Sequence, residues 1–149
     1  DLDRLRSFVT DRFGFDPGAY EGYQLPSNSD KGAFKIDWNI SQNHKFNIKY
    51  NFLRSFRDIQ PSGSGGLPQG RGPNANALPF LASFYRINNN LDSYIAELNS
   101  TFGSKFANTF QVGYTAFRDF RSTPYLPSNF PLVDVGNGAG QQLTAFGYE

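Results

Sequence analysis

Residues 34–52 read FKIDWNISQNHKFNIKYNF, and apolar and polar side chains alternate on both sides of a short break in the middle. Alternation with a period of two is typical of a β-strand with one apolar face. Residues that pair across a hairpin share a face, so apolar residues at even positions in both strands require an odd number of turn residues. The stretch therefore predicts a β-hairpin with a three-residue turn at residues 42–44, in which Phe34 lies opposite Phe52.

A second and less regular alternation lies in the middle of the chain. Apolar residues recur from Tyr94 to Leu98 and again along residues 106–116, with a short turn expected between these runs. Long stretches rich in Gly and Pro follow each pair of strands. The order is therefore strand, tight turn, strand and long loop, twice over. Outer-membrane barrels show this alternation, with short turns on the periplasmic side and long loops outside.

These patterns predict an all-β fold made of antiparallel hairpins from a large transmembrane β-barrel, with long extracellular loops and one short N-terminal helix. Each strand has the roughly 9 to 11 residues that cross a bilayer at a tilt. Four strands cannot close a barrel, because the smallest have about eight, so the edges are expected to pair with further strands. The expected segments are a loop at 1–30 with a helix at 1–13, hairpins at 31–57 and 83–120, and extracellular loops at 58–82 and 121–149.

The composition narrows the functional classes. Aromatic residues make up 17% of the chain although its mean hydropathy is −0.51, which suits strands with one lipid-facing side but equally suits a soluble all-β domain. The absence of cysteine excludes disulfides, thiolate metal sites and cysteine nucleophiles. A net charge of +1 with scattered charges argues against a nucleic-acid partner. The chain also lacks methionine, so we expect a processed form, a cleavage product or an excised segment.

Several stretches resemble TonB-dependent receptors of the Oar-like group. The hairpin sequences are SDKGAFKIDWNISQNHKFNIKYNF (29–52) and AELNSTFGSKFANTFQVGYT (96–115), supported by DPG (16–18), FPLVDV (130–135) and FGYE (146–149). The resemblance implies a bacterial outer-membrane protein that captures a substrate at the cell surface and imports it with energy from TonB. The implied partners are outer-membrane lipid, the rest of the barrel and the plug of the same receptor, TonB through segments outside this chain, and a small-molecule, glycan or peptide substrate. Whether a surface lipoprotein covers the barrel as a lid is left open by the sequence.

Two groups of polar and aromatic residues are candidates for function. The first is predicted to line the outer mouth of the barrel, where arginines and rings suit sugar or peptide capture: Arg54, Arg57, Asp58, Tyr85, Arg86, Arg118, Asp119, Arg121 and Tyr125. The alternative is that these residues solvate the rim, pair with one another and form an interfacial girdle. The second group is predicted to face the lumen and the plug, with Asp37 opposite Lys49: Lys35, Asp37, Lys49, Glu97 and Gln111.

No set of residues suggests catalysis or a cofactor. His44 is the only histidine and is expected in a turn, so a zinc site is not predicted. The glycine clusters at 63–66 and 136–140 lack the features of phosphate or dinucleotide motifs and are interpreted as loop. Asp134 and Asn137 could supply oxygen ligands to Ca²⁺, although no downstream Glu completes the pattern. We therefore expect no enzyme, cofactor or metal site; the alternative to the receptor segment is a soluble β-sandwich module that binds carbohydrate or protein.

Overall fold

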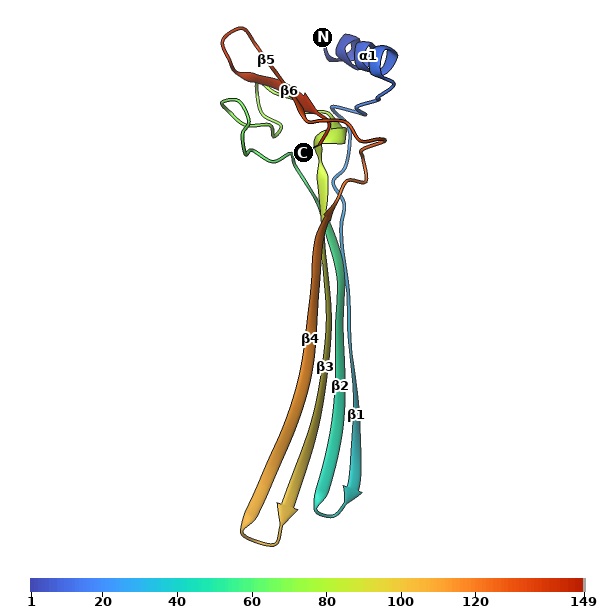
Figure 1. Cartoon of the computed structure of the whole chain (residues 1–149), viewed down its shortest axis with the longest axis vertical. Coiled ribbons are helices and arrows are strands. Elements are labelled where there is room, and N and C mark those ends of the chain that lie inside the picture. The colour runs from blue at the N-terminus through green and yellow to red at the C-terminus, as the bar shows by residue number, and fades with distance from the viewer. Residues whose placement is uncertain (149) are drawn as a thin grey trace. The chain divides into compact units, whose positions relative to one another are not determined.

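The computed structural model describes residues 1–148 and is mostly antiparallel β-structure with one short N-terminal helix, which confirms the all-β prediction at this level (Figure 1). Its strands form a four-stranded sheet in the order β1-β2-β3-β4 and a two-stranded sheet of β5 and β6. The elements are α1 (Leu2–Phe13), β1 (Ser27–Ser41), β2 (His44–Ile59), the 3-10 helix η1 (Leu81–Ser83), β3 (Tyr85–Phe102), β4 (Phe106–Ser122), β5 (Val133–Gly136) and β6 (Gln142–Phe146).

The chain divides into two compact units, which are described separately. The sheet unit comprises Asn28–Phe56 and Asn88–Phe120. The loop unit comprises Asp1–Ser27, Arg57–Ile87 and Arg121–Glu149. Within residues 1–148, no helix has the length and apolar character required to cross a membrane.

The sheet unit has one apolar and one polar face. The ring of Phe34 lies 6.4 Å from that of Tyr50 and 6.4 Å from that of Phe52, which places these even-numbered residues on one face, as the parity of the sequence predicts. Odd-numbered side chains meet on the other face, where Asn47 Nδ2 donates to Glu97 Oε1 at 3.1 Å. The sheet is open, with β1 and β4 at its two edges.

The turn between β1 and β2 differs from the prediction by one residue. β1 ends at Ser41 and β2 begins at His44, so the connection consists of Gln42 and Asn43. A regular two-residue turn would pair even with odd positions, so the shared face of Phe34 and Phe52 requires one extra residue in the pairing, as in a β-bulge. His44 is drawn into the sheet because its Nδ1 lies 2.9 Å from Ser100 Oγ. The prediction that His44 is a turn residue was therefore wrong, because His44 is the first residue of β2.

The long strands extend beyond the hairpin limits that the sequence indicated. β1 begins at Ser27 and β2 ends at Ile59, and the amide of Asp58 still donates to the carbonyl of Pro26 at 3.1 Å. The four strands have 15, 16, 18 and 17 residues. Backbone pairing therefore continues into segments whose side chains no longer alternate.

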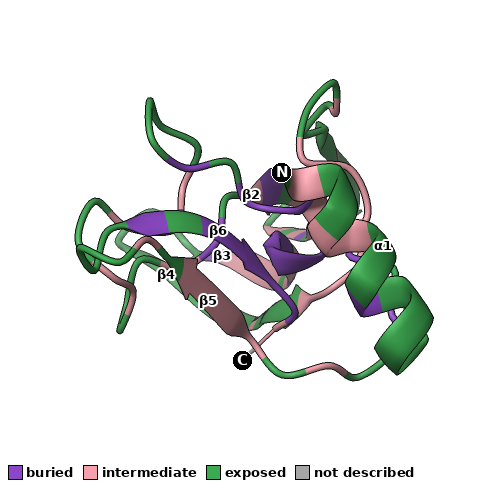
Figure 2. Cartoon of the chain, turned by 90° about the horizontal axis from the view of Figure 1, so that it is seen from above, coloured by how far each residue is buried: buried purple, intermediate pink, exposed green. Residues whose placement is uncertain are grey.

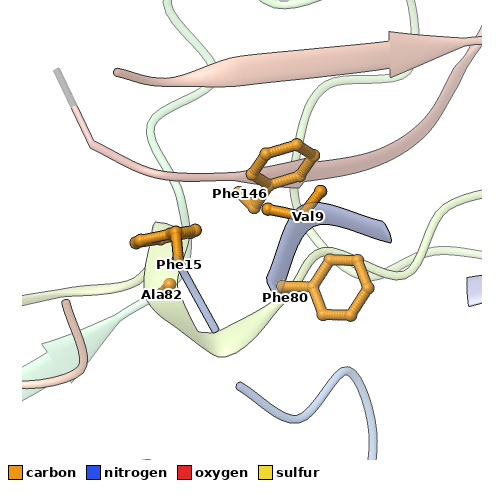
Figure 3. Close-up of a cluster of buried hydrophobic side chains, with 5 residues drawn as sticks. All are labelled: Val9, Phe15, Phe80, Ala82 and Phe146. Atoms are coloured by element: carbon orange, nitrogen blue, oxygen red, sulfur yellow. The ribbon is translucent and has the colours of Figure 1, made fainter. Parts of the chain in front are cut away.

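The loop unit has its own hydrophobic core, built from segments that are distant in the sequence. α1 begins at the capping carboxylate of Asp1, which accepts from the Arg4 amide at 3.5 Å, and ends at Gly14, whose φ of 65° is left-handed. Buried residues gather around η1 and β6 (Figure 2). The central cluster consists of Val9, Phe15, Phe80, Ala82 and Phe146 (Figure 3). Fully burying a side chain such as Phe stabilises the fold by roughly 1.5–3 kcal/mol.

Residues 121–149, interpreted from the sequence as loop, contain the hairpin of β5 and β6. Val133 pairs with Phe146, and Val135 pairs with Thr144. The intervening turn is closed by the amide of Asn137, which donates to the carbonyl of Gln141 at 2.9 Å. The strands were missed because they have only 4 and 5 residues and flank a glycine-rich turn.

Candidate functional site

The structure separates the nine predicted outer-mouth residues into two groups. Arg54, Arg118 and Asp119 belong to the sheet unit. The other six belong to the loop unit: Arg57, Asp58, Tyr85, Arg86, Arg121 and Tyr125. They do not form a single site within either unit.

Asp58, Arg86 and Tyr125 form a buried polar cluster. The Asp58 side chain is buried, and Arg86 donates to its two carboxylate oxygens from Nε at 2.6 Å and from Nη2 at 3.0 Å. The hydroxyl of Tyr125 donates to the same carboxylate. The hydrogen bonds from Arg86 hold the pKa of Asp58 below its usual value. A carboxylate saturated with internal donors is poorly placed to bind a ligand, so this cluster supports the alternative in which the charges pair with one another.

Tyr85 and Arg121 form a different arrangement, open to solvent on one side. The guanidinium carbon of Arg121 lies 4.7 Å from the centre of the Tyr85 ring, and Arg121 is exposed. The rings of Tyr85 and Tyr148 are 6.4 Å apart. A small recess here is lined by Pro61, Ser62, Ser83, Tyr85, Arg121, Leu132 and Tyr148. A cation stacked on a ring beside apolar walls can bind a carboxylate or a planar group of a ligand.

Arg54 and Arg118 meet at Asp92, a residue that the sequence interpretation missed. Asp92 is buried, and it accepts from Arg54 Nη2 at 2.7 Å and from Arg118 Nη1 at 3.4 Å. The hydroxyl of Tyr50 donates to the same carboxylate at 2.7 Å. The available signal was the position of Asp92 in the even, apolar phase of its strand, two residues before Tyr94.

Two of the outer-mouth candidates remain solvent-facing. Arg57 and Asp119 are exposed. Their contribution to a ligand site stays a prediction.

The predicted lumen-facing residues belong to the sheet unit. Their odd numbers and polar contacts are consistent with a position on its polar face. Lys35 Nζ lies 2.7 Å from Asp37 Oδ1, so Asp37 pairs along its own strand instead of with the expected partner Lys49. Glu97 Oε1 accepts from Asn99 at 2.6 Å as well as from Asn47. Lys49 is half-buried and Gln111 is exposed. The sequence analysis missed Asn47 and Asn99, which both donate to Glu97 on this face. Alternation predicts that such positions are polar but does not indicate which polar side chains contact one another.

The calcium interpretation does not match the geometry. Both carboxylate oxygens of Asp134 accept from Arg71, each at 2.7 Å, and this pairing lowers the pKa of Asp134. Asn137 Oδ1 accepts from the amides of Ala139 and Gln141 inside the turn. Within residues 1–148, no three His, Cys, Asp or Glu side chains gather in a way that could hold a metal ion. The side-chain oxygens of Asp134 and Asn137 therefore accept hydrogen bonds from Arg71 and from turn amides.

Comparison with known proteins assigns no family. No protein-family model matches the sequence, and a search of curated proteins finds no match.

Proposed function

We propose that the chain is a segment of a bacterial outer-membrane β-barrel, from a TonB-dependent receptor that imports a nutrient without chemical catalysis. The chain contributes barrel wall through β1 to β4 and ligand-capturing outer loops through its long connections. The observation that carries the proposal is the exposed apolar face of the sheet unit. Its even-numbered side chains include Phe34, Ile36, Trp38, Phe110 and Tyr114, which are 64%, 67%, 62%, 62% and 64% exposed.

An exposed apolar face of this size is more stable in contact with lipid or protein than with water. Covering apolar surface is favourable by roughly 25 cal/mol per Å², so a row of exposed rings strongly favours a lipid or protein partner. On β4 the apolar run covers residues 106–116, which at about 3.4 Å per residue is about 35 Å along the strand. At a tilt near 45°, this corresponds to about 25 Å across the bilayer, the height of the apolar band in outer-membrane barrels.

Aromatic side chains lie at both ends of this run, as expected at the two interfaces of a membrane. Near the short turns, the ring of Phe102 lies 5.6 Å from Phe106 and 5.7 Å from His44. At the other end, Tyr50 and Tyr94 stack with ring centres 4.7 Å apart. Girdles of this kind flank the lipid-facing band of outer-membrane barrels.

The polar face and the open edges agree with a place in a barrel wall. The odd-numbered side chains, with the ion pair of Lys35 and Asp37 and the hydrogen bonds of Glu97, suit a hydrated lumen or contact with a plug. The backbone groups along the free edges of β1 and β4 need partners in a membrane, which further strands of the barrel would supply.

The receptor part of the proposal draws on the resemblance of the hairpin sequences and on the loop unit. A binding loop needs an ordered surface, and the loop unit has its own core together with the Tyr85 and Arg121 recess. The recess is the place where we propose that ligand is captured. Interaction with TonB and with a plug would involve other segments of the receptor.

The soluble β-sandwich alternative would cover the same apolar face with a second sheet. Strand length argues against it, because strands of 15 to 18 residues greatly exceed the roughly 5 to 6 that are most common in globular proteins. The two proposals differ in what the even-numbered side chains touch, which is lipid in one and protein in the other.

Single-cysteine labelling distinguishes these environments, since the chain contains no cysteine of its own. Spin labels would be placed at Ile36→Cys and Val112→Cys on the apolar face, with the neighbours Lys35→Cys and Gln111→Cys as matched controls. In membranes containing the intact protein, we expect labels at 36 and 112 to collide preferentially with oxygen, which partitions into lipid. Labels at 35 and 111 should collide preferentially with a water-soluble nickel chelate.

The outcome that contradicts the membrane proposal is equally clear. In a soluble sandwich, labels at 36 and 112 would be shielded from both reagents, and the intact protein would be recovered as a monomer without detergent. The narrower receptor assignment is tested by binding of a purified periplasmic TonB domain to the intact protein. Membrane insertion without TonB binding would leave the barrel proposal standing and remove the receptor assignment.

A further inference from the structure

The apolar face of the sheet unit changes to charged residues at one level on three adjacent strands. The contacts of Arg54 and Arg118 with Asp92 show that these three residues lie beside one another. On each strand, an apolar residue lies two positions from the charged one, on the same face of the sheet. These apolar and charged neighbours are Phe52 and Arg54 on β2, Tyr94 and Asp92 on β3, and Ala116 and Arg118 on β4. A shared charged cluster therefore interrupts the apolar alternation, and the next even positions on β2 and β4 are again aromatic, at Phe56 and Phe120.

Asp92 organises this cluster without serving as a free anion. Its carboxylate is 9% exposed and accepts hydrogen bonds from Arg54, Tyr50 and Arg118 at 2.7, 2.7 and 3.4 Å. A carboxylate that accepts from three donors is internally satisfied. Its effect is to hold two guanidinium groups beside each other where the apolar alternation is interrupted.

The two arginines retain capacity for another anion. Two arginines against one aspartate leave one net positive charge in the cluster, and the Arg54 and Arg118 side chains are 43% and 66% exposed. Each guanidinium carries five N–H donors in a planar fork that matches the oxygens of a phosphate. Arg54 also lies beside a ring, with its guanidinium carbon 6.0 Å from the centre of Phe52.

We propose that Arg54 and Arg118 together bind the phosphate group of an anionic lipid headgroup in the outer leaflet. This inference rests on the proposed membrane function, which turns the even-numbered face toward lipid. Lipid phosphates lie directly beyond the acyl chains, and the two arginines lie directly beyond the apolar run, with rings on both sides of them as in an interfacial girdle. The arginines share the face of the rings and not the polar face, so the lipid headgroup, and not a substrate in the lumen, is the anion within reach.

The experiment uses the intact protein in nanodiscs with equal amounts of phosphatidylcholine and phosphatidic acid, which carries a phosphate monoester. Lipids that remain bound after release from the nanodisc are identified by native mass spectrometry. We expect the wild type to retain phosphatidic acid preferentially. Arg118→Gln and Arg54→Gln should each reduce that preference about fivefold, since an arginine near an anionic surface contributes about 1 kcal/mol.

The matched control is Arg12→Gln, which makes the same chemical change at an exposed residue of α1 and should leave the lipid preference unchanged. Arg118→Gln is the safer of the two test variants, because its hydrogen bond to Asp92 is the longest of the three. If Arg54→Gln prevents insertion, Arg118→Gln and the charge-preserving Arg54→Lys carry the test, with Arg54→Lys expected to retain part of the preference.

Spin labels at residues 35 and 36 are measured in the same nanodiscs to separate the two proposals. If oxygen accessibility alternates between them but Arg118→Gln and Arg54→Lys retain phosphatidic acid as strongly as the wild type, the headgroup site is overturned and the membrane function stands. If the accessibility does not alternate, the even face does not meet lipid and both proposals fail.

Discussion

Arg71 and Asp134 lie 63 positions apart in the sequence, yet two hydrogen bonds of 2.7 Å join the guanidinium group to the carboxylate. Arg71 is 5% exposed, and its Nη1 also donates to the carbonyls of Ser62 and Ser64 at 2.9 and 2.6 Å. One side chain thus ties the glycine-rich stretch after β2 to the β5–β6 hairpin. The stretch is held in place by specific polar contacts despite its loop-like composition.

Replacing Arg71 with Met should destabilise the loop unit by about 3 kcal/mol, because the change removes the cation paired with the partly buried Asp134 and the donor to the carbonyls of Ser62 and Ser64. The effect is measured as lost hydrogen-exchange protection of amides in residues 60–77 and 133–146. The double variant Arg71→Met with Asp134→Leu should recover part of the loss, since it leaves no unpaired charge. Unchanged protection in Arg71→Met would contradict the proposed role of this ion pair.

The stability of the loop unit should decrease in acid. Hydrogen bonds from Arg86 and Arg71 lower the folded-state pKa values of Asp58 and Asp134 below the unfolded value, which is about 3.9. A lowered folded pKa contributes stability that is present above the unfolded pKa and is lost as pH falls from there through the folded pKa. Unfolding monitored from about pH 6 down to pH 2 should show this loss.

Asp58→Asn serves as the control for this pH dependence. The variant should be less stable at neutral pH, because it removes the charge opposite Arg86, and its stability should vary less with pH below about 4. A variant with the same acid dependence as the wild type would exclude Asp58 as a contributing group.

Gly147→Ala should destabilise the C-terminal part of the loop unit by at least about 2 kcal/mol. Gly147 has a left-handed φ of 81°, and an added Cβ would lie 2.0 Å from the carbonyl oxygen of Pro131. Gly138→Ala is the matched control, since a Cβ at that position meets nothing within 4 Å. Thermal unfolding followed by near-ultraviolet circular dichroism compares the two variants, and equal midpoints would show that the space around Gly147 can relax.

Phe15→Ala should cost about 3 to 5 kcal/mol, because it empties the centre of the loop-unit core. Phe15 is 1% exposed and its ring stacks on that of Phe130 with centres 4.2 Å apart. Phe8→Ala, a change of the same size at a side chain that is 58% exposed, should cost far less. Denaturant unfolding measures both, and equal losses would mean that the core does not depend on Phe15.

Local periodicity predicted the long strands well. The even-numbered rings from Phe34 to Phe52 predicted one shared face, and ring contacts across the sheet confirm it. The helix predicted at 1–13, where Leu2, Leu5 and Val9 recur at helical spacing, is α1, which spans Leu2–Phe13. In both cases, the pattern repeats within a few residues, so neighbouring side chains are enough to indicate which face is apolar.

Long-range polar partners were not predictable in the same way. Asp92 has the same parity as the apolar residues from Tyr94 onward, and only the pairing of β2, β3 and β4 brings Arg54 and Arg118 to it. The nine outer-mouth candidates were expected to act together, but Asp58, Arg86 and Tyr125 are used to satisfy one another. Side-chain type indicates which ions can pair, whereas the distance between them depends on strand register.

The amino-acid order alone therefore established the alternating faces, the places of the tight turns to within one residue and the N-terminal helix, because these depend on contacts between residues close in the chain. Tertiary structure was needed to reveal the core formed by Val9, Phe80 and Phe146 and the ion pair of Arg71 with Asp134, since each joins segments separated by more than 60 residues. It also showed that the glycine-rich segments are ordered. These segments are stabilised by hydrogen-bond donors and apolar side chains from distant parts of the chain. Local sequence propensity cannot indicate those partners, because it depends only on neighbouring residues.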